Sequence, residues 1–181
     1  MTLEWTVEGS ERLLSDRWMN LRVDHCRTPK GRSISPYYVL DYPDWVVIVA
    51  LTEAHELVMV EQYRHGVAKV LLELPAGAAE LTDQDMEVSA RRELLEETGF
   101  AADRWTLISS LYANPATQSN RLHIFLAEGA RKVGDQQLDR GEEGMIVHVK
   151  PLDEIVPLLA TGIIGQAMHV AGLLLALAAR R

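Results

Sequence analysis

The stretch Arg92-Glu93-Leu94-Leu95-Glu96-Glu97-Thr98-Gly99-Phe100 places three carboxylates within five residues of an expected helix. At about 3.6 residues per turn, Glu93 and Glu97 stand on one face of that helix and Glu96 lies beside them. Each like-charge pair at this spacing costs an isolated helix roughly 0.2–0.5 kcal/mol, so helix stability does not explain the cluster. A divalent cation would explain it, because it neutralises the carboxylates. The plain alternative is a solvated acidic face on a surface helix.

The segment before this helix contains two strand-breaking residues. Pro75 and Gly77, within Glu73-Leu74-Pro75-Ala76-Gly77, interrupt an expected strand and leave backbone carbonyls to point into a site. A loop follows, and either Asp83 or Asp85 would cap the start of the helix. The apolar face of the helix would consist of Met86, Val88, Ala90, Leu94 and Leu95.

This order of turn glycine, acidic loop and residues 92–100 resembles the Nudix box, G-x5-E-x7-R-E-U-x-E-E-x-G-U, the signature of the Nudix hydrolase family. From Gly77 to Arg92 the chain has one residue more than the pattern, so Gln84 stands where the first glutamate of the box is expected. Two explanations stay open: Asp83 or Asp85 replaces that glutamate, or the loop bulges by one residue. Neither affects the carboxylates of the helix.

The resemblance implies a role for each matching residue. Glu93 and Glu97 would be the principal ligands of a divalent ion, and Glu96 would be a further ligand or hold a water. The Ala76 carbonyl would complete the ligand set, and Arg92 would orient the glutamates through salt bridges. Hard oxygen ligands suit Mg²⁺, with Mn²⁺ as an alternative, and such ions lower the pKa of an attacking water.

Composition is consistent with a compact enzyme. A chain of 181 residues with 48% hydrophobic content can build one well-buried core but not two substantial ones. The net charge of −8 argues against a nucleic-acid-binding surface, which needs clustered Lys and Arg. The single cysteine, Cys26, excludes a disulfide framework and is expected to be buried. We expect a cytoplasmic protein, because no signal peptide is evident and the apolar segment 167–179 is shorter than the roughly 20 residues of a membrane span.

Hydrophobic periodicity predicts an α/β fold, with a mixed β-sheet sandwich flanked by helices and a small N-terminal antiparallel sheet. The N-terminal sheet would contain a hairpin with strands over 18–26 and 35–40 and a turn at 29–32. Further strands are expected over 45–51, 56–63, 105–112, 121–128 and 145–149, with helices over 152–159 and 164–179 besides the box helix. We therefore expect a β extension over residues 1–42, for dimerisation and base binding, and a Nudix hydrolase domain over 43–181.

Two segments outside the box bear on the substrate. Glu61-Gln62-Tyr63-Arg64-His65-Gly66 with residues 72–77 is similar to the Nudix branch that acts on ADP-ribose and other nucleoside diphosphate sugars. Arg64 would contact a phosphate or ribose, unless it forms a surface ion pair, and Glu73 would be a substrate contact or supporting group. In the loop 112–123, Asn114-Pro115 stands where many ADP-ribose enzymes carry Ser-Pro-Gly. Its Asn120 and Arg121 would contact substrate or anchor the loop.

A third segment, Asp139-Arg140-Gly141-Glu142-Glu143-Gly144-Met145, is acidic and flanked by glycines. Related enzymes often supply a general base from such a loop, so Glu142 or Glu143 would activate the water. Glu143 is favoured by its position before the expected strand. A carboxylate held ionised near a metal accepts a proton from water. The plain alternative is a solvated acidic turn.

The N-terminal region also contains aromatic side chains that could stack on a nucleobase. Trp18 and Tyr37 are the expected substrate contacts among a set that also includes Trp5, Tyr38 and Trp45. The alternative for each is a place in the core.

The resulting prediction is an enzyme that uses metal and water to split a nucleoside diphosphate sugar into a nucleoside monophosphate and a sugar phosphate. ADP-ribose is the leading substrate and GDP-mannose or a similar compound is next. The alternatives are a nucleoside triphosphate pyrophosphohydrolase and a nucleotide-sugar sensor without turnover. Intact Arg92, Glu93, Glu96 and Glu97 favour an enzyme. The resemblance also implies a homodimer, and we expect neither nucleic acid nor membrane as a partner.

Overall fold

The computed structural model describes residues 2–16 and 19–180, which form two compact units. One unit contains the chain up to Pro43 together with Tyr112–Arg121, and the other contains Asp44–Leu111 and Leu122 onward. The predicted boundary between residues 42 and 43 stays a prediction. The loop 112–121, which lies far along the chain, groups with the N-terminal unit, and no local sequence pattern indicated this.

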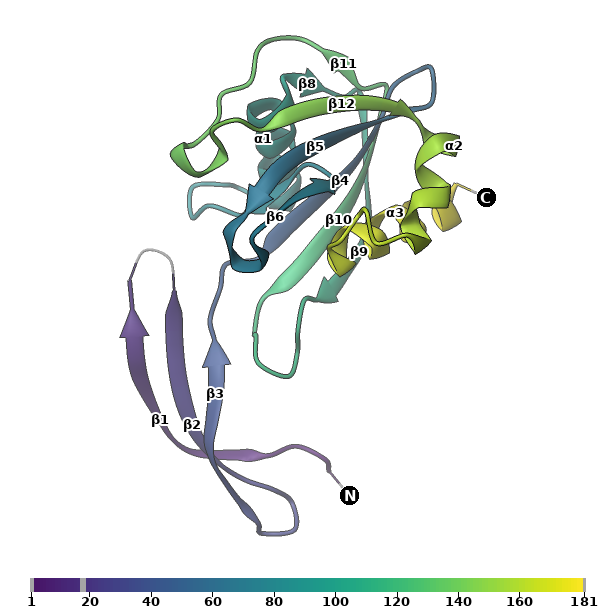
Figure 1. The fold of residues 1–181 in the computed structure, drawn as a ribbon. Helices are drawn as coiled ribbons and strands as arrows, with labels where there is room; N and C mark the ends of the chain where they lie inside the picture. The colour runs from purple at the N-terminus through teal and green to yellow at the C-terminus, as the bar shows by residue number, and fades with distance from the viewer. Residues whose placement is uncertain (1, 17–18, 181) are drawn as a thin grey trace. The chain divides into compact units, whose positions relative to one another are not determined.

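The N-terminal unit is a three-stranded antiparallel sheet in the order β1-β2-β3 (Figure 1). Its strands are β1 (Thr6–Ser15), β2 (Asn20–Arg27) and β3 (Ser33–Leu40). The predicted hairpin between β2 and β3 is confirmed: the Gly31 N–H donates to the Thr28 carbonyl across 2.8 Å, and Gly31 has a φ of 82°. Strand β1 was not predicted, because nearly all of its residues are exposed and show no buried face. Cys26 is buried, as expected.

The larger unit contains a seven-stranded mixed sheet. Its central path runs in the order β12-β5-β4-β10-β9, while β6 pairs with β5 and β7 pairs with β4. Strands β4 and β10 are parallel, and the pairings of β4 with β5 and β7 are antiparallel. The bounds are β4 (Trp45–Leu51), β5 (Glu56–Arg64), β6 (Lys69–Glu73), β7 (Ala76–Ala78), β9 (Arg104–Tyr112), β10 (Arg121–Glu128) and β12 (Ile146–Pro151). A separate pair joins β8 (Phe100–Ala101) to β11 (Arg131–Lys132).

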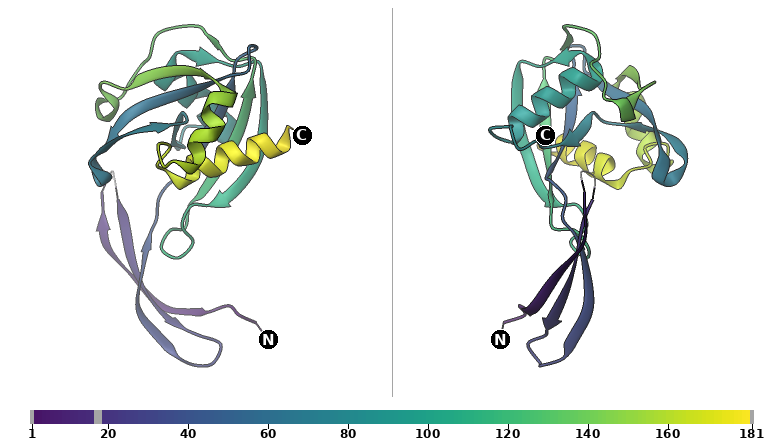
Figure 2. Two further views of the ribbon diagram at one scale, coloured as in Figure 1. Left: turned by 45° about the vertical axis from the view of Figure 1, so that its right-hand side comes forward. Right: turned by 90° about the vertical axis from the view of Figure 1, so that its left-hand side faces the viewer.

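Strand β4 divides the core into two layers, because successive side chains of a strand point to opposite faces. Val46, Ile48 and Ala50 pack in one cluster with residues of α1 (Met86–Thr98). Val47, Val49 and Leu51 pack in the other cluster with residues of α3 (Ala167–Ala179). The two helices therefore cover opposite faces of the sheet, which can be followed in Figure 2. The predicted α/β class with a helix-flanked mixed sheet is confirmed.

Several predicted bounds shift in the structure. The expected helix 152–159 is a short α2 (Leu152–Ile155) followed by a 3-10 segment, η3 (Val156–Ala160). Helix α3 begins at Ala167 rather than at residue 164, because Gln166 has an extended backbone with φ −103° and ψ 120°. Among the described residues, no helix is long and apolar enough to cross a membrane.

The segment after β6 differs from the expected strand break. Ala76–Ala78 forms strand β7, which pairs with β4 through Val47 opposite Ala76 and Val46 opposite Gly77. The Pro75 carbonyl accepts a hydrogen bond of 2.9 Å from the Ile48 N–H, so it does not point into a site. This pairing between distant segments fixes β7 against the centre of the sheet.

Helix α1 has well-defined ends that fix the register of its carboxylates. Asp85 is the N-cap, and its side chain accepts from the Val88 N–H across 2.9 Å. Gly99 is the C-cap, with a φ of 72°, and its N–H donates to the Leu95 carbonyl across 2.8 Å. A Cβ at Gly99 would lie 2.2 Å from the Gly134 carbonyl oxygen.

We expect Gly99→Ala to destabilise the protein by at least about 1–2 kcal/mol, the cost of a left-handed backbone for a residue with a Cβ. For a chain of this length the melting temperature should fall by roughly 2–8 °C. Thermal unfolding followed by circular dichroism measures the shift. Gly66→Ala is the control, since its Cβ meets no atom within 4 Å. Equal melting temperatures for the two variants would contradict the assigned C-cap.

Candidate active site

Glu93 and Glu97 lie on the buried face of α1, against β7. They are 7% and 1% exposed, respectively. The Ala76 N–H donates to Glu97 Oε2 across 3.0 Å. A Cβ built on Gly77 would lie 2.1 Å from the Glu93 carboxyl carbon, so only glycine leaves room for this carboxylate. The structure thus brings together the two glutamates and the turn segment that the sequence analysis had connected.

Burial raises the pKa of Glu93 to about 7, although the neighbouring Arg92 charge opposes the shift. Burial also raises the pKa of Glu97 well above its usual range, with the Ala76 N–H acting against it and the charges of Glu93 and Glu142 adding to it. Two buried carboxylates side by side are unfavourable when ionised, and a cation between them reverses this.

The donor set fits a magnesium or manganese ion in chemistry, since it consists of hard carboxylate oxygens. Within residues 2–16 and 19–180, no three acidic, histidine or cysteine side chains are gathered closely enough to form a metal site by themselves. An ion here would therefore take further oxygen ligands from the backbone, water or substrate phosphates. Magnesium sites in phosphate-processing enzymes commonly have this mixed composition.

Arg92 connects the acidic residues of the helix to each other and to β7. Its Nη1 donates to Glu93 Oε1 across 2.9 Å and to Glu96 Oε2 across 3.0 Å. Its Nη2 donates to the Ala78 carbonyl across 3.0 Å. The Arg92 guanidinium is thus in a position to orient the glutamates, as the sequence predicts. Glu96 is partly exposed and lies at the edge of this acidic cluster.

Of the two aspartates considered for the first glutamate of the box, Asp83 is the one that contacts helix α1 beyond its N-cap. Its Oδ2 accepts from Ser89 Oγ across 2.7 Å and from Arg92 Nη2 across 3.2 Å. Burial acts to raise the pKa of Asp83, but the hydrogen bonds from the Glu80 N–H, Ser89 and Arg92 lower it overall. Gln84 is exposed and Asp85 caps the helix, so Asp83 is the acidic residue of this loop that contacts Arg92.

The acidic loop before β12 places Glu142 and Glu143 differently. Glu142 ends a 3-10 segment, η2 (Arg140–Glu142), is half-buried, and accepts from the Asp139 N–H across 3.0 Å. Its charge raises the pKa of both Glu93 and Glu97, so it lies within electrostatic reach of the pair. Glu143 is exposed. The geometry therefore favours Glu142 over Glu143, the residue favoured from the sequence.

Two glutamines that the sequence analysis did not single out attach this acidic loop to α1. Gln136 Nε2 donates to the Glu97 carbonyl across 2.7 Å. The Gln137 N–H donates to the Glu96 carbonyl across 2.8 Å. Because both bonds connect distant segments of the chain, no local pattern signalled them.

Arg64 forms an ion pair, but not the surface pair considered as its alternative. Its Nη2 lies 2.6 Å from Glu73 Oε2, and Glu73 is fully buried. Gln62 Nε2 also donates to Glu73, across 3.4 Å. Glu73 has no exposed surface and holds Arg64, which fits the supporting role. A direct contact of Glu73 with substrate stays a prediction. The Arg64 side chain remains 41% exposed at the wall of a cavity.

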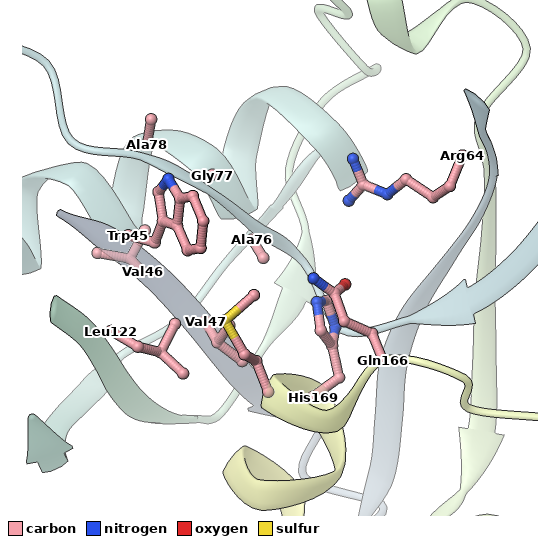
Figure 3. A pocket seen from close by; sticks show the side chains of 11 residues that line it. Trp45, Val46, Val47, Arg64, Ala76, Gly77, Ala78, Leu122, Gln166 and His169 are labelled. Atoms are coloured by element: carbon pink, nitrogen blue, oxygen red, sulfur yellow. The ribbon is translucent and has the colours of Figure 1, made fainter. Parts of the chain in front are cut away.

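This cavity has a volume of about 350 Å³ and adjoins β7 (Figure 3). Arg64 and β7 line one part, and Gln166 and His169 of the α3 region line another. The remaining walls are formed by Trp45, Val46, Val47, Leu122 and Met168. Gln166 and His169 were not predicted as site residues. The available signal was a histidine within an otherwise apolar C-terminal helix.

The substrate contacts predicted in the N-terminal unit interact with other residues of the same unit. Asn120 is buried, and its Nδ2 donates to the Pro43 carbonyl across 3.1 Å. The Arg121 guanidinium lies 4.9 Å from the centre of the Tyr112 ring. The Tyr37 hydroxyl donates to the Ala116 carbonyl across 2.6 Å. These contacts fit loop anchoring, and roles in substrate binding stay predictions. Trp18 lies outside the described residues.

Comparison with protein families gives two matches that together span most of the chain. A family described as nucleoside diphosphate sugar hydrolase N-terminal domain matches residues 5–40. A family described as NUDIX domain matches residues 42–168.

Individual relatives agree with these matches. An ADP-ribose pyrophosphatase of Mycobacterium tuberculosis is 32% identical over 166 residues, covering 92% of this chain and 80% of the relative. A methanol dehydrogenase activator of Bacillus methanolicus is 34% identical over 123 residues, covering 68% of this chain and 65% of the relative. A solved structure of an ADP compounds hydrolase superposes with a TM-score of 0.84 at 22% identity, covering 97% of this chain and 94% of that one. This last likeness supports the fold.

Proposed function

The chain belongs to the Nudix hydrolase family, and from that premise we propose that it hydrolyses the pyrophosphate bond of ADP-ribose or a closely related nucleoside diphosphate sugar. The observation that carries the proposal is the buried pair Glu93 and Glu97, packed against β7 beside a cavity that Arg64 lines. The N-terminal family match and the pyrophosphatase relative support a nucleotide sugar as substrate.

Enzymes of this family generally use a divalent metal ion. We propose that Glu93 and Glu97 hold such an ion here, magnesium first and manganese second, with Glu96 and the Ala76 carbonyl as further ligands. When bound, the ion would polarise the pyrophosphate and lower the pKa of the attacking water. Arg92 keeps Glu93 and Glu96 in place through hydrogen bonds of 2.9 and 3.0 Å.

Arg64 is proposed to bind a phosphate of the substrate. Its ion pair with the buried Glu73 fixes the direction of the guanidinium, so little side-chain freedom is lost when a second anion binds. The planar guanidinium presents five N–H donors, more than one carboxylate can use. Arg64 therefore can hold Glu73 and a phosphate oxygen at once.

Glu142 is proposed to accept the proton of the attacking water. It is half-buried and within electrostatic reach of Glu93 and Glu97, and Gln136 and Gln137 attach its loop to the same helix. The prediction from the sequence favoured Glu143, which is exposed. A base has to approach the water within hydrogen-bonding distance. Glu142 fits the role better, because its charge acts on Glu93 and Glu97, where the water would be activated.

We expect Glu142→Gln to lower kcat by about 100-fold or more, since a positioned general base contributes on the order of 10²–10⁴. KM should change little, because the amide keeps the size of the side chain and accepts from the Asp139 N–H. Glu143→Gln is the matched neighbour and should keep nearly the wild-type rate. Steady-state kinetics on ADP-ribose separates the two, and a large loss only in Glu143→Gln would restore the sequence-based choice.

A homodimer is proposed from the family resemblance and from the exposed apolar side chains of the N-terminal unit. Soluble monomers seldom expose many large apolar side chains close together in a small unit. The side chains concerned are Leu3, Trp5, Val7, Leu13, Leu14, Met19 and Tyr38. Light scattering after gel filtration measures the mass, and a monomer at all concentrations would contradict this proposal.

The substrate is tested by turnover of ADP-ribose, GDP-mannose, UDP-glucose, NADH and 8-oxo-dGTP, each with magnesium, manganese and chelator. We expect metal-dependent cleavage of a nucleotide sugar, with ADP-ribose first and GDP-mannose next. The Asn114-Pro115 loop departs from the ADP-ribose pattern, which is why GDP-mannose belongs in the panel. Preferred cleavage of 8-oxo-dGTP, or tight binding of a nucleotide sugar without cleavage, would overturn the proposal.

A further inference from the structure

The cavity beside β7 has a polar group of its own on the side of α3. His169 is 1% exposed, and its Nδ1 accepts from the Leu74 N–H across 2.8 Å. Burial and the charge of Arg64 lower the pKa of His169 to about 3, so the ring is neutral. In a neutral imidazole whose Nδ1 is an acceptor, the proton is on Nε2. His169 therefore offers a hydrogen-bond donor from the wall of the cavity.

Gln166 offers the complementary group. Its Oε1 is buried and has no hydrogen-bond partner among the described residues. A buried acceptor without a partner costs roughly 1–3 kcal/mol, and a turn of the terminal amide toward the cavity that Gln166 lines would let a ligand supply the missing donor. Figure 3 shows the Gln166 amide next to the His169 ring, with Arg64 across the cavity from both.

The other walls are apolar and contain a single aromatic ring. The apolar side chains that line the cavity include Trp45, Leu122, Met168 and Val47. An acceptor and a donor beside an apolar wall suit a sugar, because each hydroxyl both donates and accepts while the C–H faces pack against apolar groups. A nucleobase would be held better between two flat rings, and the lining has only Trp45.

The position of the cavity also favours a sugar as its ligand. β7 lines the cavity through Ala76 and Gly77, and the same two residues contact Glu97 and Glu93. Arg64 lines the same cavity, and its charge acts on both Glu97 and His169. A group bound in the cavity is thus the one joined directly to a phosphate. In a nucleoside diphosphate sugar both groups joined directly to a phosphate are sugars, but the ribose of the nucleoside also carries the base. The terminal sugar is therefore the one that a cavity of about 350 Å³ can enclose by itself.

We propose that this cavity binds the sugar at the end of the substrate opposite the base, and that Gln166 and His169 determine which sugar is accepted by bonding its hydroxyls. The inference rests on the proposed function. A volume of about 350 Å³ lies near the lower end of the range for ligand pockets, so it suits one sugar rather than a whole nucleotide sugar.

Gln166→Leu tests the inference, since it removes the acceptor and keeps a similar volume. The fold should tolerate it, because Oε1 has no bond to lose. We expect the Kd of ribose 5-phosphate or mannose 1-phosphate, measured by calorimetry, to rise about 5- to 100-fold. The Kd of AMP should stay unchanged. The selectivity of kcat/KM between ADP-ribose and ADP-glucose should fall, while selectivity between ADP- and GDP-linked forms of one sugar should not.

Gln84→Leu is the matched control, because Gln84 is exposed and the change in chemistry is the same. Unchanged sugar-phosphate binding in Gln166→Leu, or a change in base selectivity alone, would overturn the inference. The proposed function would still stand in that case, provided that the wild type turns over the substrate. Absence of turnover in the wild type, with Gln166→Leu still weakening sugar-phosphate binding, would overturn the proposed function and leave the sugar site. Thermal unfolding of each variant confirms that the folded protein is compared.

Discussion

Glu97→Gln should lower kcat by more than about 100-fold while the protein keeps its fold. Loss of a group that only supports a metal ligand costs about 10- to 100-fold, so loss of a principal ligand should cost more. The amide oxygen can still accept from the Ala76 N–H, which now bonds Glu97 Oε2 across 3.0 Å. A neutral amide is also no costlier to bury than a carboxylate. The loss should therefore appear in turnover and in manganese binding, and not in the melting temperature.

Glu87→Gln is the control for this variant, since Glu87 lies on the same helix with its side chain 43% exposed and pairs with Arg91 across 2.8 Å. An exposed pair of this kind contributes less than about 1 kcal/mol, so neither stability nor turnover should change much. Steady-state kinetics, manganese titration and thermal unfolding on both variants complete the test. A wild-type rate in Glu97→Gln would remove the metal assignment.

Gly77→Ala should have a comparable effect through geometry alone. The added Cβ would lie 2.1 Å from the carboxyl carbon of Glu93, so either that carboxylate or strand β7 has to move. A displacement of about 1 Å in an active site can cost about 100-fold in rate. We therefore expect kcat to fall by at least that factor, with a lower melting temperature as β7 separates from the helix.

Gly134→Ala serves as the comparison for Gly77→Ala, because its Cβ meets no atom within 4 Å. Its turnover should stay near that of the wild type. Should Gly77→Ala retain full activity, the close packing of Glu93 against β7 would be wrong, and with it the placement of the carboxylate beside the cavity.

Much of the fold follows from local patterns. Strand β4 has the predicted bounds because its unbroken apolar run is typical of a strand buried on both faces. Helix α1 follows from the Asp85 cap and the Gly99 stop. Strands β1 and β7 were not predicted, because β1 has no buried face and β7 is a three-residue strand defined by its pairing with β4.

Site residues could be predicted from the sequence where they lie on one helix, because their spacing fixes which face they share. Glu93 and Glu97 share a face of α1, and four residues of separation on a helix require this. The choice between Glu142 and Glu143 depends on the turn made by η2, which the acidic loop sequence does not specify. His169 is held at the cavity by its hydrogen bond from the Leu74 N–H, 95 positions away, and Gln166 lies beside it. Contacts between such distant residues have no local signature.

The most direct test of the metal-dependent activity is hydrolysis of ADP-ribose by the wild-type protein with its products identified. The reaction is followed first in magnesium, then in excess chelator, then with magnesium restored. We expect release of AMP and ribose 5-phosphate that stops with chelator and returns with magnesium. Hydrolysis that continues undiminished in chelator would contradict the role of Glu93 and Glu97. Binding of ADP-ribose and GDP-mannose without release of any product would contradict the enzyme itself.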